Sequence, residues 1–527
     1  MIQSQEDRKM VRDAGLLSLY TMISRILGLL REMTKARFLG TGDLSDAFAV
    51  SFVIPNFMRR LFAENSISVA FIPTFKGYLH EGEDKATQRF LSSSLTVLAI
   101  LVGATVALGI ATTPIIVKAF GTDPGETAVL TRIMFPFLAL VSFAALLQGI
   151  LNSYGIFGPS GFAPILFNIC FIAVPWIVSR WMGNPARAMA VGVVFGGLAQ
   201  ALWQLPAVVR SGVRLGFISP WIAFRDPGMK KVFALIAPTI LGMAAYQINE
   251  LVSTAFASRA GLGTASSLQY SLRLMELILG IFAVSAGTVL LPSLTDAAKH
   301  KDWQRYSERL GKTLESLLLV TIPVAVFSMI AGKEIVTLLF KRGGFTEESV
   351  RLTAEAFFWH QAGLAFIAAN RVVAPAFYAR SDSKTPAYAG IASFGVNILL
   401  VWFLASPFKG PGIAFALSFS SAVNTGLLAF MLLKGKTPGL AAALGADLRY
   451  AGKLLAFSMA AAIPTILARG PALALFSSSS PLAAAGLPLF CMALIYGTVG
   501  IVLLAAVKDP VAASLASGLH RKGRRKE

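Results

Sequence analysis

Apolar residues run through this chain in long blocks that short polar segments separate. Each block is about as long as the roughly 20 residues that a helix needs to cross a hydrocarbon core of about 30 Å. Loop signals divide the blocks into fourteen predicted helices. Their approximate cores are 16–38, 47–75, 91–117, 128–154, 161–179, 188–209, 232–258, 265–295, 314–331, 352–379, 387–404, 411–433, 450–468 and 485–507. The pattern therefore predicts an all-α integral membrane protein.

A weak internal similarity divides the predicted helices into two sets. The segment LFAENSISVAFIP (61–73) has a counterpart in IFAVSAGTVLLP (281–292), and SRILGLLRE (24–32) has a fainter one in PTILGMAAYQINE (238–250). Parallel repeats are typical of transporters whose halves rock about a central site. We expect two pseudo-symmetric six-helix lobes with two extra C-terminal helices. The predicted boundaries are 1–210 for the N-lobe, 211–231 for a cytoplasmic linker, 232–434 for the C-lobe, 435–507 for the extra helices and 508–527 for a basic cytoplasmic tail.

Composition excludes several classes of protein. The 527 residues are 55% hydrophobic and only 14% charged, whereas a soluble domain has about a quarter of its residues charged. The two cysteines and four histidines are scattered and match no disulfide or metal-site spacing. No nucleophile–base pair or phosphate-binding loop is found either. We therefore predict no enzyme, no metal site and no cofactor.

The charge balance predicts the orientation in the membrane. The net charge is +20. With the N-terminus in the cytoplasm, 28 lysines and arginines fall in predicted cytoplasmic segments and nine on the opposite side. This bias follows the positive-inside rule, so both termini are predicted to be cytoplasmic. Membrane lipids, whose anionic headgroups attract such charges, are the predicted partners, and no nucleic acid is predicted.

Arginines inside predicted spans suggest what the protein binds. A charge at mid-bilayer costs about 2.5–3.5 kcal/mol, so it usually faces a wet cavity or a partner. Arginine stays charged when desolvated and binds phosphate bidentately. We therefore predict a cationic central cavity for a pyrophosphate, lined by Arg25, Arg31, Arg59, Arg60 and Arg273.

Acidic residues accompany these arginines, and other cations lie near helix ends. Arg273 and Glu276 are spaced to pair at i,i+3, and Arg25 and Glu32 share one helix face. Gating or ion-pair roles are predicted for Glu32, Asp46 and Glu276. Four cations near helix ends are expected to reach the headgroups instead: Lys35, Arg37, Arg132 and Arg351.

Several segments together resemble one family. They are SRILGLLRE (24–32), DAFAVSFVIPNFMRRLFAENSISVAFIP (46–73), GILNSYGIFGPSGFAPILFN (149–168), YSLRLMELILGIF (270–282) and FYARSDSKTP (377–386). The match is collinear over essentially the whole chain and is similar to the MurJ/MviN lipid II flippases of bacterial inner membranes. That family belongs to the multidrug/oligosaccharidyl-lipid/polysaccharide exporter superfamily, and the resemblance implies fourteen helices in two lobes.

The resemblance also implies an activity. It implies that lipid II, the undecaprenyl-pyrophosphate-linked peptidoglycan precursor, moves from the inner to the outer leaflet of the cytoplasmic membrane by alternating access. Residues 435–507 would form a groove for the polyprenyl tail, and cell-wall synthesis machinery is an implied partner. Residues that match the family's essential charges are Arg25, Arg31, Asp46, Arg59, Arg60, Arg273 and Glu276.

Some positions depart from the family, and some alternatives stay open. Some relatives bind sodium through an Asn followed one turn later by Asp, but here Asn370 is followed by Ala374. Coupling to the membrane potential and coupling to a monovalent cation are both left open. The alternative functions are a flippase for another polyprenyl-pyrophosphate glycan, a cation-coupled multidrug exporter and a non-transporting scaffold for a cell-wall enzyme complex.

Overall fold

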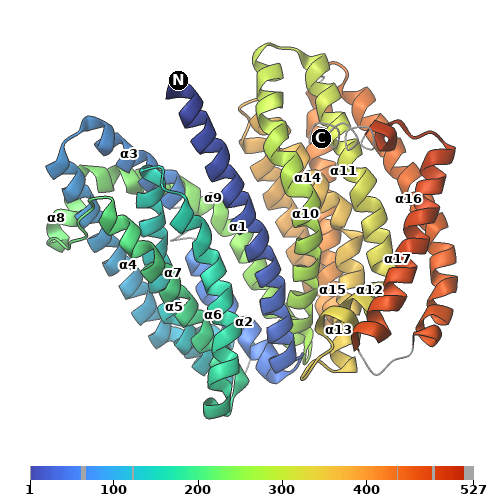
Figure 1. Cartoon of the computed structure of the whole chain (residues 1–527), viewed down its shortest axis with the longest axis horizontal. Helices are drawn as coiled ribbons and strands as arrows, with labels where there is room; N and C mark the ends of the chain where they lie inside the picture. The colour runs from blue at the N-terminus through green and yellow to red at the C-terminus, as the bar shows by residue number, and fades with distance from the viewer. Residues whose placement is uncertain (1, 61–66, 122–123, 436, 477–480, 515–527) are drawn as a thin grey trace. The chain divides into compact units, whose positions relative to one another are not determined.

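The computed structural model of the chain describes residues 2–60, 67–121, 124–435, 437–476 and 481–514. Every regular element in these ranges is helical, so the predicted all-α class is confirmed (Figure 1). The chain divides into two compact units, Met1–Ser266 and Ser267–Glu527. The lobe and linker boundaries predicted from the sequence stay a prediction, and so does the repeat, whose clearest motif falls largely outside the described side chains.

The first unit is a set of long helices joined by short connections. The helix α6 packs against α7, α7 against α5, α5 against α2, and α1 against α6. Buried side chains of α2, α5, α6 and α7 form one apolar core, and those of α3, α4, α5 and the segment before α9 form another. The elements are α1 (Ile2–Leu39), α2 (Asp43–Arg59), the π-helical η2 (Ile67–Phe71), α3 (Ile72–Glu81), α4 (Asp84–Ala119), α5 (Pro124–Ser153), α6 (Gly158–Met182), α7 (Pro185–Arg210), α8 (Pro220–Arg225) and α9 (Pro227–Ala260).

Capping side chains fix where two of these helices begin. The Asn184 carboxamide oxygen accepts hydrogen bonds from the first backbone N–H groups of α7, and the Asp226 carboxylate does the same for α9. Both helices continue with proline, which has no N–H to satisfy at that position. The polar residue followed by proline at each site therefore explains a helix start that the apolar pattern alone does not give.

The second unit is also entirely helical in its described residues. The helix α11 packs against α16, α14 and α13, and α17 packs against α16 and α12 (Figure 1). The elements are α10 (Thr264–Lys299), which begins in the last residues of the first unit, α11 (Trp303–Ile330), α12 (Gly332–Phe340), α13 (Glu347–Ala362), α14 (Leu364–Tyr378), α15 (Lys384–Lys434), α16 (Leu440–Leu475) and α17 (Pro481–Ala506).

Two predicted helices meet within α15. The backbone at Lys409 leaves the helical region, with φ 48° and ψ −129°, and prolines stand at 407 and 411. A Cβ at Gly412 would lie 2.5 Å from the Leu404 carbonyl oxygen, so only glycine permits this tight bend. The bend falls between the predicted cores 387–404 and 411–433, as the loop signals there indicated.

The number of spans is compatible with the sequence prediction. Among the described residues, eight helices are long and apolar enough to cross a membrane: α4, α5, α6, α7, α11, α15, α16 and α17. The other predicted cores are helical in the described residues, except that 352–379 is two helices, α13 and α14, which meet at Gly363. Multiple spans make this a multi-pass membrane protein, and the count of fourteen stays a prediction.

We predict a specific cost for a side chain at Gly121, which follows α4 with φ +73°. A Cβ there would lie 2.5 Å from the Arg259 side chain, whose guanidinium donates to the Ala119 carbonyl oxygen at 2.6 Å. Gly121→Ala should therefore cost about 1–3 kcal/mol of left-handed backbone strain and about 1 kcal/mol for the displaced hydrogen bond. The measurement is the midpoint of thermal unfolding in detergent.

Gly155 provides a matched control. Its φ is +72°, and no atom lies within 4 Å of a Cβ built there. Gly155→Ala should therefore show the backbone strain alone. Equal midpoints for the two variants would contradict the proposed clash with Arg259.

Candidate functional site

A buried ion cluster lies near the C-terminal end of α1. The Glu32 carboxylate is 7% exposed and pairs with the Arg31 guanidinium at 2.9 Å and with the Lys35 ammonium at 3.0 Å. The sequence suggested that Glu32 shares a face with Arg25, and the structure instead places it between two other cations of the same helix. Because the cluster is largely withdrawn from solvent, its opposite charges stabilise one another strongly.

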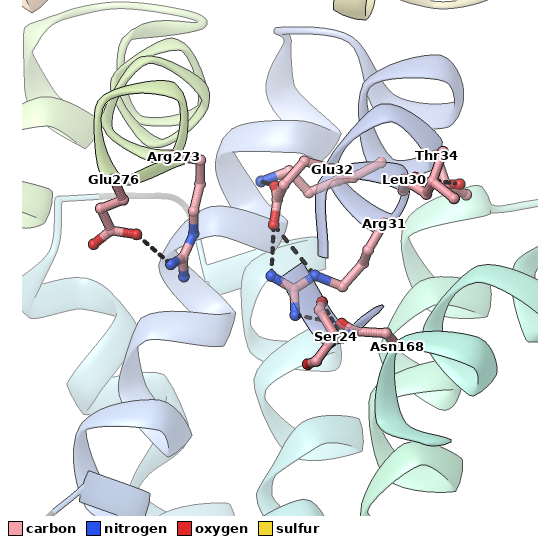
Figure 2. A network of polar contacts seen from close by, with 9 residues as sticks. Ser24, Leu30, Arg31, Glu32, Thr34, Asn168, Arg273 and Glu276 are labelled. Carbon is pink, nitrogen blue, oxygen red and sulfur yellow. Dashed lines mark hydrogen bonds and ion pairs between the residues drawn. The ribbon is translucent and has the colours of Figure 1, made fainter. Parts of the chain in front are cut away.

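The same cluster attaches α1 to α6. The Arg31 guanidinium donates to the Asn168 side-chain oxygen at 3.1 Å, and the Asn168 amide donates to the Ser24 carbonyl oxygen at 3.2 Å. Figure 2 shows Arg31 between the Glu32 carboxylate and the Asn168 amide. The Arg31 guanidinium also lies 5.5 Å from the centre of the Phe171 ring. Arg31 therefore holds two helices together in this structure.

A glycine of α6 lets α1 approach closely. A Cβ on Gly161 would lie 2.6 Å from a methyl group of Leu17. Gly161 and Asn168 both belong to the segment GILNSYGIFGPSGFAPILFN, and they lie seven residues apart on α6. Two helical turns place them on one face of α6, so this part of the segment forms the surface on which α1 packs.

Arg25 differs from Arg31. Its side chain is exposed, and among the residues that the structure describes no hydrogen bond or ion pair to it is found. Its neighbours on the same side of α1, Met22 and Ile26, are each 55% exposed. Arg25 is therefore a guanidinium exposed on an apolar face of α1.

The two arginines at the end of α2 have partners within the first unit. The Arg60 guanidinium pairs with the Glu250 carboxylate of α9 at 2.6 Å and donates to the Gln247 side-chain oxygen at 3.0 Å. Arg59 donates to the Asn56 side-chain oxygen, one turn earlier, at 3.0 Å. The structure thus brings Arg60 and the seventh predicted helix together, a contact that sequence spacing did not reveal.

Asp46 caps the start of another helix. It lies in the first turn of α2, is 8% exposed, and accepts hydrogen bonds from the backbone N–H groups of Gly263 at 2.6 Å and Ser266 at 2.8 Å. These N–H groups belong to the N-terminus of α10, where a carboxylate is stabilised by the helix dipole. Asp46 therefore links α2 to the residues that begin α10.

Arg273 and Glu276 form the ion pair that their spacing predicts. The guanidinium and carboxylate lie 2.6 Å apart on α10, and both side chains are about two-fifths exposed, at 39% and 43% (Figure 2). An exposed pair contributes little stability, so its carboxylate can be exchanged for another anion at small cost.

Three of the four cations near helix ends, Arg37, Arg132 and Arg351, are exposed, and their contact with headgroups stays a prediction. The guanidinium carbon of Arg37 lies 4.8 Å from the centre of the Trp176 ring. The expectation was wrong for Lys35, which is 6% exposed and faces Glu32. The i,i+3 spacing of Glu32 and Lys35 is the signal that could have shown this. No local spacing pointed to Asn168, which comes from a distant helix.

Comparison with known proteins identifies the family of this chain. The family model described as "Lipid II flippase MurJ" matches residues 35–482. A relative from Treponema pallidum, named "Probable lipid II flippase MurJ", is 41% identical over 95% of this chain and 97% of its own length. The chain belongs to the lipid II flippase MurJ family. A further member from Burkholderia cenocepacia is 34% identical over 73% of this chain and 76% of its own length.

Solved structures share the fold. The structure titled "Lipid II flippase MurJ, inward closed conformation" aligns with a TM-score of 0.77 at 23% identity, covering 93% of this chain and 98% of that one. An inward-facing multidrug transporter of the MATE family, in the MOP superfamily, aligns with a TM-score of 0.66 at 14% identity, covering 81% and 98%. The MurJ fold is thus one version of a wider transporter architecture.

The family segment FYARSDSKTP forms the connection between α14 and α15. The Asp382 carboxylate accepts hydrogen bonds from the backbone N–H groups of Lys384 and Thr385 and from the Thr385 hydroxyl. The backbone and hydroxyl hydrogen bonds from Thr385 hold the pKa of Asp382 below its usual range. Arg380 donates to the Thr437 hydroxyl at 3.1 Å. This segment therefore caps α15 and ties the α14 end to the connection before α16.

Asn370 has protein partners from α15 in this structure. Asn370 accepts a hydrogen bond from the Thr425 hydroxyl at 3.0 Å and donates to the Ser421 carbonyl oxygen at 3.3 Å. The position one turn later is Ala374. Asn370 thus joins α14 to α15. Coupling of transport to a monovalent cation stays one of the two predicted alternatives.

Removing the acid of the α1 cluster should destabilise the protein. Glu32→Gln leaves the Arg31 and Lys35 charges buried without a carboxylate, and breaking a buried pair costs about 3–5 kcal/mol. We expect a large drop in the thermal unfolding midpoint in detergent. The double variant Glu32→Gln/Lys35→Met should recover part of it, because the second change removes one uncompensated charge.

An exposed pair supplies the control. Glu308 pairs with Lys312 on α11, and both side chains are more than half exposed. Glu308→Gln should cost less than about 1 kcal/mol. If Glu32→Gln were as mild as Glu308→Gln, the buried cluster would not be what holds α1.

Proposed function

We propose that this protein is a lipid II flippase, which carries the undecaprenyl-pyrophosphate-linked peptidoglycan precursor from the inner to the outer leaflet of the bacterial cytoplasmic membrane. The observation that carries the proposal is family membership over residues 35–482, joined to arginines at the family's charged positions. The protein moves its substrate without making or breaking a covalent bond, so it is a transporter and not an enzyme. Both termini lie in the cytoplasm, in keeping with the positive-inside bias of the sequence.

The arginines receive the pyrophosphate group. Arg25 supplies an exposed guanidinium from α1, and the half-buried Arg59 supplies another from the end of α2. A guanidinium binds phosphate oxygens through two parallel hydrogen bonds, and each such charge-assisted bond contributes about 1.5–3 kcal/mol. Arg31 contributes from the same helix as Arg25 while its contact with Asn168 fixes the helix in place.

Two further arginines exchange partners when the substrate binds. The Glu250 carboxylate occupies Arg60 and the Glu276 carboxylate occupies Arg273 in this structure. Both pairs are partly exposed, so a pyrophosphate can replace the carboxylate as the anionic partner. Exchange of this kind gives the substrate a differential affinity for two conformations, which is what a ligand needs to shift an equilibrium between them. Glu32, Asp46 and Glu276 then form ion pairs or hydrogen bonds that are kept or exchanged as the protein alternates between its two conformations.

The polyprenyl tail stays in the lipid phase along the extra C-terminal helices. The exposed apolar side chains of α16 and α17 suit such a role, and they include Met459, Ile463, Leu467, Phe490 and Leu494, each at least 57% exposed. A lipid chain requires only an apolar surface, so this surface would select its ligand less strictly than the arginine site. Lipid II and bulk membrane lipids are the partners in the proposal, with cell-wall synthesis machinery as a further one.

Arginine replacements test the site. We expect Arg25→Ala and Arg59→Ala to lower delivery of lipid-linked precursor to the outer leaflet at least tenfold, because each removes about one charge-assisted interaction of 1.5–3 kcal/mol. The variants are expressed as the sole copy, their membrane levels are matched, and accessible precursor is measured with an enzyme or probe confined to the outside.

Arg132→Ala is the matched control, since Arg132 is also an exposed arginine of a first-unit helix. It should leave delivery within about twofold of the unaltered protein. Normal delivery by Arg25→Ala and Arg59→Ala, at normal membrane level, would remove the site assignment. A purified protein that moves a different polyprenyl-pyrophosphate glycan but not lipid II would favour the alternative substrate.

The membrane potential supplies direction in this proposal. An anion that moves outward from a negative interior gains about 2.3 kcal/mol per charge per 100 mV. A pyrophosphate with two net charges would thus gain roughly 4–5 kcal/mol per 100 mV, which is more than a thousandfold bias. In proteoliposomes with an imposed potassium diffusion potential, we expect net movement to follow its sign. Movement that is unchanged when the potential is collapsed would leave coupling to a monovalent cation as the alternative.

A further inference from the structure

A buried carboxylate with no partner lies near the start of α16. Asp447 is 6% exposed, and neither of its carboxylate oxygens has a hydrogen-bond partner in the described part of the chain. Other buried acids in the protein, such as Asp46 and Asp226, accept several hydrogen bonds. Asp447 is therefore exceptional and requires a physical explanation.

The carboxylate points toward a glycine of α11. A Cβ built on Gly311 would lie 3.7 and 3.8 Å from the two Asp447 oxygens and 3.3 Å from the Ala443 Cβ. The absence of a side chain at 311 thus lets α16 approach α11 closely at the carboxylate. Glu315 follows Gly311 by four residues, so it lies on the same face of α11, and it is close enough to act on Asp447 electrostatically.

Among the residues that the structure describes, no ion pair to either of these two acids is found. Lys312 pairs with Glu308 on α11, and Arg309 donates to the Ser293 hydroxyl. On α16 itself, Lys453 pairs with Asp509 beyond α17. Arg305 pairs with Asp296, Arg469 pairs with Glu334, and Tyr450 donates to Asp509. The other ionisable groups on or beside the packed helices are exposed: Arg449, Lys384, Lys409, Lys434 and Lys508.

A bound metal ion or a bound proton could each neutralise the Asp447 and Glu315 carboxylates, and the two need different numbers of ligands. A metal ion requires several oxygen ligands, and no group of three or more His, Cys, Asp or Glu side chains in the described residues could hold one. A proton needs only one carboxylate oxygen. A bare ionised carboxylate without donors is the costly alternative, because burial of an unpaired charge carries a large desolvation penalty.

We propose that α11 and α16 form a proton-binding site, in which Asp447, packed against Gly311, holds a proton beside Glu315. The proton removes the repulsion between the two carboxyl groups and permits the close packing of α16 against α11. Loss of the proton places two like charges in the same interface and weakens that packing. The site is therefore a proton-dependent contact between a helix of the C-terminal pair and the rest of the second unit.

A consequence for transport follows if the proposed function holds. Because α16 is one of the two helices assigned to the polyprenyl tail, proton binding at Asp447 would set how firmly that surface is held. This consequence rests on the proposed function, whereas the proton site itself does not. The experiment below therefore reads the carboxyl group directly and involves no lipid substrate.

Infrared spectroscopy of the purified full chain in lipid tests the site. A protonated carboxylic acid gives a C=O stretching band distinct from that of a carboxylate, and deuteration shifts it. We expect such a band at neutral pH, lost in Asp447→Asn and retained in Glu308→Gln, which removes an exposed and paired acid of α11. Glu315→Gln should also retain it. Absence of the band in the unaltered protein, or its persistence in Asp447→Asn, would overturn the proposal, and its loss only in Glu315→Gln would place the proton on the other residue.

Thermal unfolding provides a second readout that does not depend on spectral assignment. An asparagine has nearly the shape of a protonated aspartate, so Asp447→Asn should unfold at about the same temperature as the unaltered protein at neutral pH. A proton held in the folded state makes stability fall as pH rises. The unaltered protein should therefore lose more of its midpoint between pH 7 and 9 than Asp447→Asn does. Parallel curves for the two proteins would contradict proton binding at this position.

Discussion

Compensation of buried charge is the constraint on which the rest of this structure depends. An ionised side chain withdrawn from water is tolerated only with an opposite charge or several hydrogen-bond partners. Glu32 has two cations on its own helix, Glu334 has Arg469 of a distant helix at 2.8 Å, and Asp46 has the backbone N–H groups at the start of α10. These contacts mostly connect different helices, so they also determine which helices pack together.

The arginine chemistry follows from the degree of this compensation. A guanidinium that is largely buried in a network, as Arg31 is with 19% of its side chain exposed, positions its helix and is more costly to displace. A guanidinium that is exposed or half-exposed, as Arg25 and Arg273 are, loses little when its partner changes. The same residue type therefore serves for architecture at one position and for binding at another. Depth, and not the sequence motif alone, separates the two roles.

The sequence predicted the elements better than their contacts. Apolar blocks of about one membrane thickness gave the helical class and the bend within α15, because span length and proline–glycine signals are local properties. The Arg273–Glu276 pair was predictable for the same reason, since both residues lie on one turn. The Arg60–Glu250 and Arg31–Asn168 contacts join residues more than 130 positions apart, and no local period encodes which distant helix will face which. The prediction that Lys35 reaches the headgroups was wrong, because a residue near a helix end can still be buried by an ion pair.

Among the acids that the structure describes, Asp447 is the buried one whose two carboxylate oxygens both lack a hydrogen-bond partner. Its position in the fold shows what such a charge would affect. It lies in a helix that packs on α11 and α17, so an uncompensated charge there would act on the contact of the C-terminal pair with the second unit. An apolar residue is often neutral or stabilising at a buried ionic position, so packing alone does not require an acid there. A carboxyl group opposite a glycine and beside a second acid is better explained as a group whose charge changes. In these proposals, the arginines bind the anion of the substrate, and a proton adjusts the packing of two helices in the second unit.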